Sequence, residues 1–303
     1  MSTTIREHVD VSVKHVERKK LPVIVPFSYN YIGAFLTFRC PYRCSYCINR
    51  FHGEKVANYK EISGKEWLNF FDRVETKLPI TLQGGEPGIH KDFIEIVKVL
   101  LEKFEVDILT NLAFDLRKFV KEIDPSIINR DAPYAPIRVS YHPEQFSLEE
   151  IVKKILFLQD AGFRVGLYGV AHPNQLSLIE EAKRVCVDLG IDFRIKEFLG
   201  WYSGKLYGQY AFPDACSGSF RKKCECAPSE LLVSPDGRIY RCHYFLYEEK
   251  SFLATIKDDN IILTDDFLPC DSFGQCNPCD VKIKNNRFQN FGHVSVRIRN
   301  IVD

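Results

Sequence analysis

The feature of this sequence that most limits its fold is a repeated alternation of β-rich and helical runs between residues 30 and 200. The β-rich runs are short, and they cover 34–39, 79–83, 105–110, 137–142, 164–171 and 192–198. The helical runs place apolar residues at steps of three and four, and they cover 64–75, 90–104, 147–162 and 175–190. Alternating strands and helices predict a parallel sheet with right-handed crossovers. We therefore expect an α/β fold, a partial (β/α)6 barrel of parallel strands.

The alternation stops near residue 200, which predicts three parts. Residues 1–29 form an N-terminal extension, 30–200 the partial barrel, and 201–303 a connection followed by a small cysteine-rich domain. This last part contains the pattern of a β-hairpin over 231–243, with a Pro-Asp-Gly turn at 235–237.

Composition excludes several classes of protein. The 303 residues include 41 basic and 40 acidic ones, so the net charge of +1 argues against a chain built mainly to bind nucleic acid. No apolar run is long enough for a transmembrane helix, and the first residues lack the apolar run of a signal peptide. We expect a cytoplasmic location and no membrane partner.

The cysteines are numerous and clustered. There are 11 of them, an odd number that disfavours a disulfide scaffold in a reducing compartment. Three lie at 40–47, seven lie between 216 and 279, and Cys186 stands alone on the apolar side of a helical run, as a small core residue would. Clustered thiols in such a compartment predict metal binding.

The first cluster, Cys40-x3-Cys44-x2-Cys47, offers three thiolates on one short loop. Three thiolates can hold three irons of a [4Fe–4S] cluster and leave the fourth iron open. A zinc site with His52 as the fourth ligand is the alternative. The loop follows the first strand and "GGEP" (84–87) follows the second. Because ligands bind at the carboxyl ends of parallel strands, we expect the two segments to meet there.

These two segments, with aromatic Tyr46 directly before Cys47, resemble the signatures of the radical S-adenosylmethionine (radical SAM) family over residues 30–200. The resemblance implies that S-adenosylmethionine binds the open iron. One electron, from a donor such as flavodoxin or ferredoxin, cleaves its S–C5′ bond. The 5′-deoxyadenosyl radical then abstracts hydrogen from a substrate carbon.

The resemblance also implies cofactor-binding residues. The methionine amino group is assigned to the backbone and side chain of Gly84, Gly85, Glu86 and Pro87. Ser140 is a candidate for the methionine carboxylate, and Tyr46 for a contact with adenine. Lys196 and Glu197, at the end of the last strand, are candidate acid–base residues, with a buried salt bridge as the alternative.

The second cysteine set resembles the twitch or shortened SPASM auxiliary-cluster domain of radical SAM enzymes, because a cysteine-flanked hairpin precedes a later CxxC pair. The resemblance implies a second [4Fe–4S] cluster, whose ligands would be Cys224, Cys242, Cys276 and Cys279. Cys226 can replace Cys224, since either spacing fits. The remaining thiols, Cys216, Cys226 and Cys270, are structural or donate a hydrogen atom to a substrate radical.

The metal and the role of this second set stay open. The alternative is a zinc ribbon that only stabilises the C-terminal part, because four thiolates bind zinc equally well. A cluster there can accept an electron from a substrate radical, bind substrate, or hold structure.

The sequence is consistent with three kinds of function. We expect oxidation or dehydrogenation of a small molecule, since only about 30 residues precede the predicted barrel, too few for a leader-peptide-binding module. The alternative is a peptide-modifying enzyme, and a further class is a non-enzymatic metal-binding or electron-transfer protein. A molybdopterin-precursor cyclase is disfavoured because the final residues lack its glycine pair.

Overall fold

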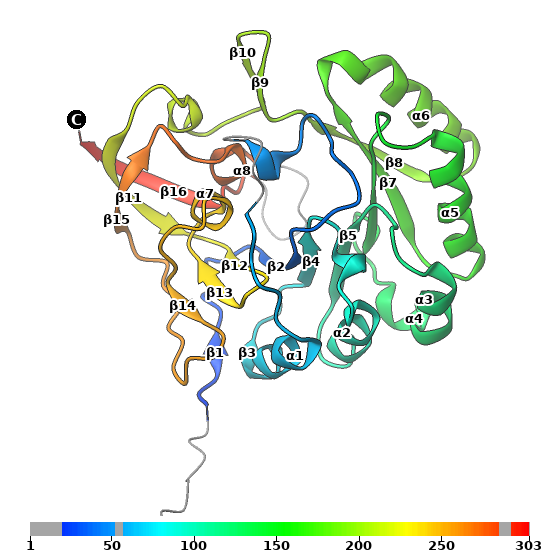
Figure 1. The fold of residues 1–303 in the computed structure, drawn as a ribbon, viewed down its shortest axis with the longest axis horizontal. Coiled ribbons are helices and arrows are strands. Elements are labelled where there is room, and N and C mark those ends of the chain that lie inside the picture. The colour runs from blue at the N-terminus through cyan, green and yellow to red at the C-terminus, as the bar shows by residue number, and fades with distance from the viewer. Residues whose placement is uncertain (1–19, 52–56, 285–291, 303) are drawn as a thin grey trace, which may run out of the picture.

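The computed structural model describes residues 20–51, 57–284 and 292–302, with only the backbone for 300–302. Its main feature is a nine-stranded sheet in the order β14-β13-β12-β2-β4-β5-β6-β7-β8. Figure 1 shows this sheet through the middle of the molecule, with helices α1 to α6 along its outer side and the C-terminal segments at the opposite end.

Six consecutive strands of this sheet are parallel and confirm the six predicted β-rich runs. They are β2 (Ile32–Thr37), β4 (Ile80–Gly84), β5 (Val106–Thr110), β6 (Ile137–Tyr141), β7 (Val165–Ala171) and β8 (Asp192–Glu197). Within the described residues the sheet is open, since β8 pairs only with β7. The curvature of a partial barrel stays a prediction.

The predicted helical runs contain helices, and two shorter helices beside the parallel strands were not predicted. The helices beside the parallel strands are α1 (Gly64–Arg73), α2 (Phe93–Leu100), α3 (Leu116–Glu122), α4 (Pro125–Ile128), α5 (Leu148–Asp160) and α6 (Leu176–Asp188). Ser63 with Glu66 and Ser147 with Glu150 form capping boxes, which fix where α1 and α5 begin. Within the described residues, no helix is long and apolar enough to cross a membrane.

The predicted hairpin is present, and it belongs to the main sheet. Strands β12 (Leu231–Val233) and β13 (Arg238–Tyr240) are antiparallel, and Gly237 in the turn has φ +83°, which glycine adopts without strain. However, β12 also pairs in parallel with β2, and β14 (Ala254–Thr255) extends the sheet further. The hairpin therefore continues the central sheet beside the strand that leads to the first cysteine cluster. The division of the chain at residue 200 stays a prediction.

The rest of the C-terminal part surrounds a second apolar core that contains Cys216, Cys224, Cys226, Cys242 and Cys276. A three-stranded antiparallel sheet covers it, made of β15 (Leu268–Phe273), β11 (Lys222–Pro228) and β16 (Val296–Val302). The remaining elements are β1 (Val23–Ile24), β3 (Val74–Glu75), β9 (Gly200–Tyr202), β10 (Lys205–Tyr207), α7 (His243–Tyr247), α8 (Pro278–Val281) and four 3-10 turns at Ile48–Arg50, Pro87–Ile89, Pro173–Gln175 and Pro213–Cys216.

Candidate functional site

The first cysteine cluster lies on the loop after β2. Cys40 is exposed, whereas Cys44 and Cys47 are half-buried. Burial raises the pKa of all three thiols, that of Cys44 to about 12. Asn111, just after β5, donates a hydrogen bond from Nδ2 to the Cys40 sulfur at 3.6 Å. Metal ligation requires thiolates, so a bound metal would displace these protons.

The GGEP segment packs directly against the backbone that leads into this loop. The Gly85 amide donates to the Thr37 carbonyl at 2.7 Å, and the Glu86 amide donates to the Arg39 carbonyl at 2.9 Å. A β-carbon on Gly84 would lie 2.1 Å from Thr37 O, and one on Gly85 would lie 2.2 Å from Arg39 O. Only glycine permits this contact, and the two predicted signatures therefore meet as expected.

The Glu86 carboxylate is fully buried and joins the ends of β4 and β5. It accepts hydrogen bonds from Thr110 Oγ1 at 2.7 Å, the Asn111 amide at 2.6 Å and the Gly88 amide at 2.9 Å. Burial raises its pKa to about 7, although these hydrogen bonds act in the opposite direction. Glu86 thus holds the GGEP backbone in place, and its contact with the methionine amino group stays a prediction.

Glu144 and Gln145, which follow β6, anchor the cysteine loop. Neither was predicted from the sequence. Glu144 accepts from the Ser45 amide at 2.6 Å and from Ser45 Oγ at 2.9 Å. Gln145 Oε1 accepts from the Arg43 amide at 3.0 Å. Their position at the carboxyl end of a predicted strand was the only signal that could have indicated this role.

Tyr46 lies among histidines from the ends of β6 and β7. Its hydroxyl is 3.0 Å from His142 Nδ1, and its ring stacks on that of His172 with 5.2 Å between centroids. Burial lowers the pKa of His142 to about 4, so this imidazole is neutral at pH 7. The arrangement makes an aromatic face beside the cysteine loop, where the contact of Tyr46 with adenine stays a prediction.

Ser140, Lys196 and Glu197 lie on β6 and β8, the two strands on either side of β7. Ser140 is half-buried on β6 and is in register with Tyr168 on β7. The Lys196 ammonium lies 4.9 Å above the Tyr168 ring. Glu197 forms an ion pair with Lys282 at 3.3 Å and accepts from the Gln209 amide at 3.0 Å. His52, the alternative zinc ligand, lies outside the described residues.

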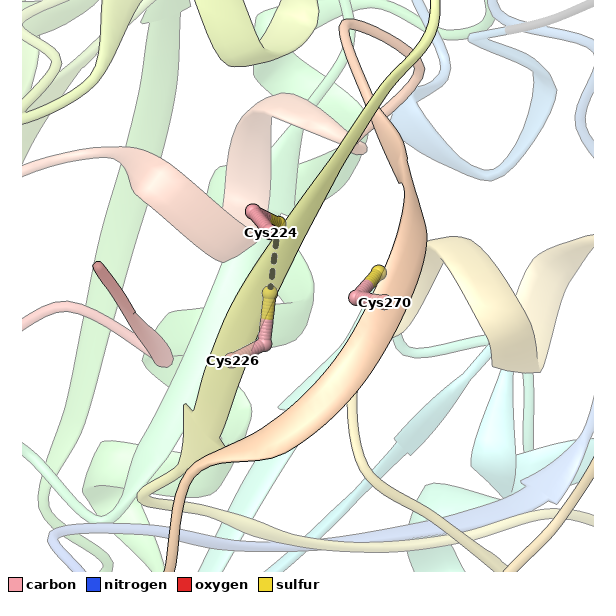
Figure 2. Close-up of side chains that lie close together, drawn as sticks. All are labelled: Cys224, Cys226 and Cys270. Atoms are coloured by element: carbon pink, nitrogen blue, oxygen red, sulfur yellow. Dashed lines mark hydrogen bonds between the residues drawn. The ribbon is translucent and has the colours of Figure 1, made fainter. Parts of the chain in front are cut away.

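The second cysteine set differs from the expected grouping. The structure brings Cys270 beside Cys224 and Cys226, and the three sulfurs lie within 4.8 Å of one another (Figure 2). The sequence predicts a structural or hydrogen-donating role for Cys270, not a ligand role. A small cavity next to this trio is lined by Cys226, Cys270, Cys242 and Cys276, among other residues. Neither Cys224 nor Cys279 lines it.

Fold and site together describe an α/β protein with a three-thiol loop at the carboxyl edge of a parallel sheet. Three thiolates are a donor set that can hold three irons of an iron–sulfur cluster. Residues 35–132, which contain this loop and the GGEP segment, match the model of the Radical SAM superfamily. This part of the chain is therefore similar to the domain of that superfamily. S-adenosylmethionine and a [4Fe–4S] cluster are the cofactors that the superfamily implies.

Curated proteins also match, over stretches of different length. The PqqA peptide cyclase of Ruegeria pomeroyi is 22% identical over 260 residues, which cover 69% of this chain and 66% of that protein. An S-adenosylmethionine-dependent nucleotide dehydratase of Selenomonas ruminantium is 29% identical over 84 residues, 26% of this chain and 29% of that protein. The chain thus spans just under two thirds of the peptide cyclase.

Solved structures share the fold. SuiB of Streptococcus suis, solved with its precursor peptide SuiA, has a TM-score of 0.52 and 15% identity, over 79% of this chain and 64% of that one. AnSMEcpe with bound AdoMet and a peptide has a TM-score of 0.53 and 12% identity, over 78% of each chain. All these matches together support an enzyme of the radical SAM superfamily and leave its subclass open.

Proposed function

We propose that this protein is a radical SAM enzyme whose first cluster is held by Cys40, Cys44 and Cys47. The observation that carries the proposal is the direct packing of the GGEP backbone on the segment that enters this three-thiol loop. A [4Fe–4S] cluster with bound S-adenosylmethionine supplies one-electron cleavage of the S–C5′ bond and a radical that removes hydrogen from a substrate carbon.

The chain's own residues fit this role in three ways. Three thiols on one loop, without a fourth protein ligand in the motif, suit a cluster with an open iron. Glu144, which follows β6, fixes the cysteine loop, and Glu86 fixes the GGEP segment to the end of β5, so the site is held in place before any ligand binds. The face made by Tyr46 and His172 offers stacking area for an adenine ring.

For the substrate we propose a peptide, and this revises the small-molecule expectation. The support is that the relatives matching most of the chain are named PqqA peptide cyclases, and that structures with this fold were solved with peptides bound. A small molecule is the second candidate, supported by the nucleotide dehydratase that matches 84 residues. An auxiliary [4Fe–4S] cluster in the C-terminal cysteines would accept the electron that a substrate radical must lose in a net oxidation.

The test uses anaerobically reconstituted protein with dithionite and S-adenosylmethionine, and it measures 5′-deoxyadenosine. The proposal predicts this nucleoside from the parent and none from Cys44→Ala. A non-enzymatic electron carrier would form none in either protein, and equal formation by both would exclude the assigned ligands.

The class of substrate can be tested without knowing the substrate. Protein-free extract of the source cells should raise the rate of 5′-deoxyadenosine formation. Extract first digested with a broad-specificity protease, then heated to inactivate the protease, should lose this effect if the substrate is a peptide. Stimulation that survives digestion would favour a small molecule instead.

A further inference from the structure

The two faces of the parallel sheet differ in chemistry. The side that α1 to α6 cover in Figure 1 is apolar, and Leu82, Ile108 and Val139 on this side belong to the main core. Successive side chains of a strand point to opposite faces, so the residues next to these point to the other side, which we call the inner face. The polar residues of the inner face, one from each of five neighbouring strands, include Gln83, Asp107, Arg138, Tyr168 and Lys196.

Burying polar side chains on this face costs free energy unless they find partners, and part of the set does find them. The Asp107 carboxylate forms an ion pair with Arg138 at 2.8 Å and another with Arg130. It also accepts a hydrogen bond from the Tyr134 hydroxyl at 3.0 Å. Three partners therefore satisfy Asp107, and it holds the Arg138 guanidinium by one nitrogen, Nη2.

Three donors of the inner face have no hydrogen-bond partner among the described residues. They are Tyr168 Oη, Arg138 Nε and Gln83 Nε2, and all three atoms are buried. Tyr168 is only 3% exposed, and burial raises the pKa of its hydroxyl, which therefore keeps its proton. An unmade hydrogen bond of a buried group is unfavourable, so a ligand that accepts from these donors would stabilise the site.

The structure places the three donors in one neighbourhood. A β-carbon on Gly33 would lie 2.3 Å from Gln83 Nε2 and 3.1 Å from the Tyr31 ring, so the Gln83 amide and Tyr31 lie side by side over β2. Burial lowers the pKa of Arg138, but neighbouring groups raise it more, among them the hydroxyls of Tyr31 and Tyr168. Arg138 is therefore within electrostatic range of both Tyr168 and the tyrosine beside Gln83.

The charge of this neighbourhood suits an anion with one negative charge. Asp107 already neutralises Arg138 in part, so an incoming group meets one N–H of this guanidinium and two uncharged donors. The Lys196 ammonium, 4.9 Å above the Tyr168 ring, adds positive charge. A carboxylate accepts several hydrogen bonds with one negative charge, whereas a phosphate group brings about two. The site therefore favours a carboxylate.

We propose that Gln83, Arg138 and Tyr168 bind a carboxylate group on the inner face of the sheet. That this carboxylate belongs to the substrate rests on the proposed function, and a peptide offers such a group at its C-terminus or on an acidic side chain. The site differs from the one expected for the methionine carboxylate. Ser140 lies two residues nearer the carboxyl end of β6 than Arg138, about 7 Å along the strand.

The first measurement compares two identical changes, Tyr168→Phe and Tyr134→Phe. The Tyr134 hydroxyl donates to Asp107, whereas the Tyr168 hydroxyl has no partner in the part of the chain that the structure describes. Tyr134→Phe should therefore lower the midpoint of urea unfolding, and Tyr168→Phe should leave it unchanged or raise it. A loss at Tyr168→Phe as large as that at Tyr134→Phe would overturn the proposal, since the hydroxyl would then serve the fold.

Binding is measured with glutarate as the probe and its uncharged diamide, glutaramide, as the control. Anaerobically reconstituted protein is heated with increasing probe at constant ionic strength, and the shift of the melting midpoint gives the affinity. Glutarate should raise the midpoint of the parent, and glutaramide should not. Tyr168→Phe should weaken the affinity for glutarate about tenfold or more, because a hydrogen bond to a charged group is lost. Tyr134→Phe should bind glutarate like the parent.

Three results of this titration would overturn the proposal. Two are equal binding of glutaramide by the parent and equal binding of glutarate by Tyr168→Phe. The third separates the site from that of the cofactor: S-adenosylmethionine at a saturating concentration should leave the affinity of the parent for glutarate unchanged. Competition between them would assign the donors to the methionine carboxylate instead.

The last step links the site to the reaction. Untreated protein-free extract should stimulate 5′-deoxyadenosine formation by the parent, whereas extract whose carboxyl groups have been converted to methyl esters should not. Stimulation that survives esterification would overturn the assignment of the carboxylate to the substrate. If glutarate binding depends on Tyr168 but the parent forms no 5′-deoxyadenosine, the carboxylate site stands and the proposed function fails.

Discussion

Replacing Gly85 by alanine tests whether the GGEP segment shapes the first metal site. The new β-carbon would lie 2.2 Å from the Arg39 carbonyl oxygen and 2.6 Å from that of Phe38. Both contacts are to backbone directly before Cys40, so no side chain can rotate away. Overpacking of this kind costs about 1–3 kcal/mol, and loss of the Gly85–Thr37 hydrogen bond adds about 1 kcal/mol. We expect the backbone before Cys40 to shift.

The matched control is Gly190→Ala, at the end of α6. Nothing lies within 4 Å of a β-carbon there, although φ is +70°. This change should cost about 1–2 kcal/mol from backbone strain alone. Both variants are unfolded in urea to obtain the free energy of unfolding, and iron is counted after anaerobic reconstitution.

We expect Gly190→Ala to bind iron like the parent and Gly85→Ala to lose the irons of the first site as well as more stability. If Gly85→Ala keeps the parent's iron content and loses no more stability than the control, the GGEP backbone does not hold the cysteine loop and the reasoning is refuted.

Three further predictions concern single side chains of the site. Cys44→Ala should form no 5′-deoxyadenosine by chromatography, and formation at the parent rate would contradict the ligand assignment. The pKa of Glu86 in the folded protein, about 7, exceeds its ordinary value of 4.5, so between pH 4.5 and 7 the folded state binds more protons than the unfolded state. The free energy of unfolding should therefore fall by about 3 kcal/mol as the pH rises through this range. Glu86→Gln should remove this part of the pH dependence of the free energy of unfolding in urea. An unchanged dependence on pH would contradict the assigned pKa of Glu86. Tyr46→Phe removes the contact of the hydroxyl with neutral His142 and should cost about 1 kcal/mol while iron content stays the same; parent-like stability would show that this contact contributes nothing.

The parallel sheet was predictable because its signal is local. Each of its six parallel strands lies in a short β-rich run, and each long helix has its own periodicity and, in α5, its own capping box. The short helices α3 and α4 were missed, since seven and four residues carry too little periodicity to recognise.

Contacts between distant segments were not predictable. The hairpin was recognised from its turn, but its pairing with β2 depends on register across about 200 residues of sequence. The same holds for Cys270, which reaches Cys224 through the register of two antiparallel strands. Spacing within a motif located the first metal site because its three ligands share one loop, whereas the second set comes from several elements.

The most direct test of the account is one assay on the reconstituted parent protein. Dithionite and S-adenosylmethionine are added anaerobically, and 5′-deoxyadenosine is quantified together with iron and sulfide per chain. The account predicts about eight irons, or about four with one zinc, and formation of the nucleoside. Zinc as the only metal, with no 5′-deoxyadenosine, would contradict it.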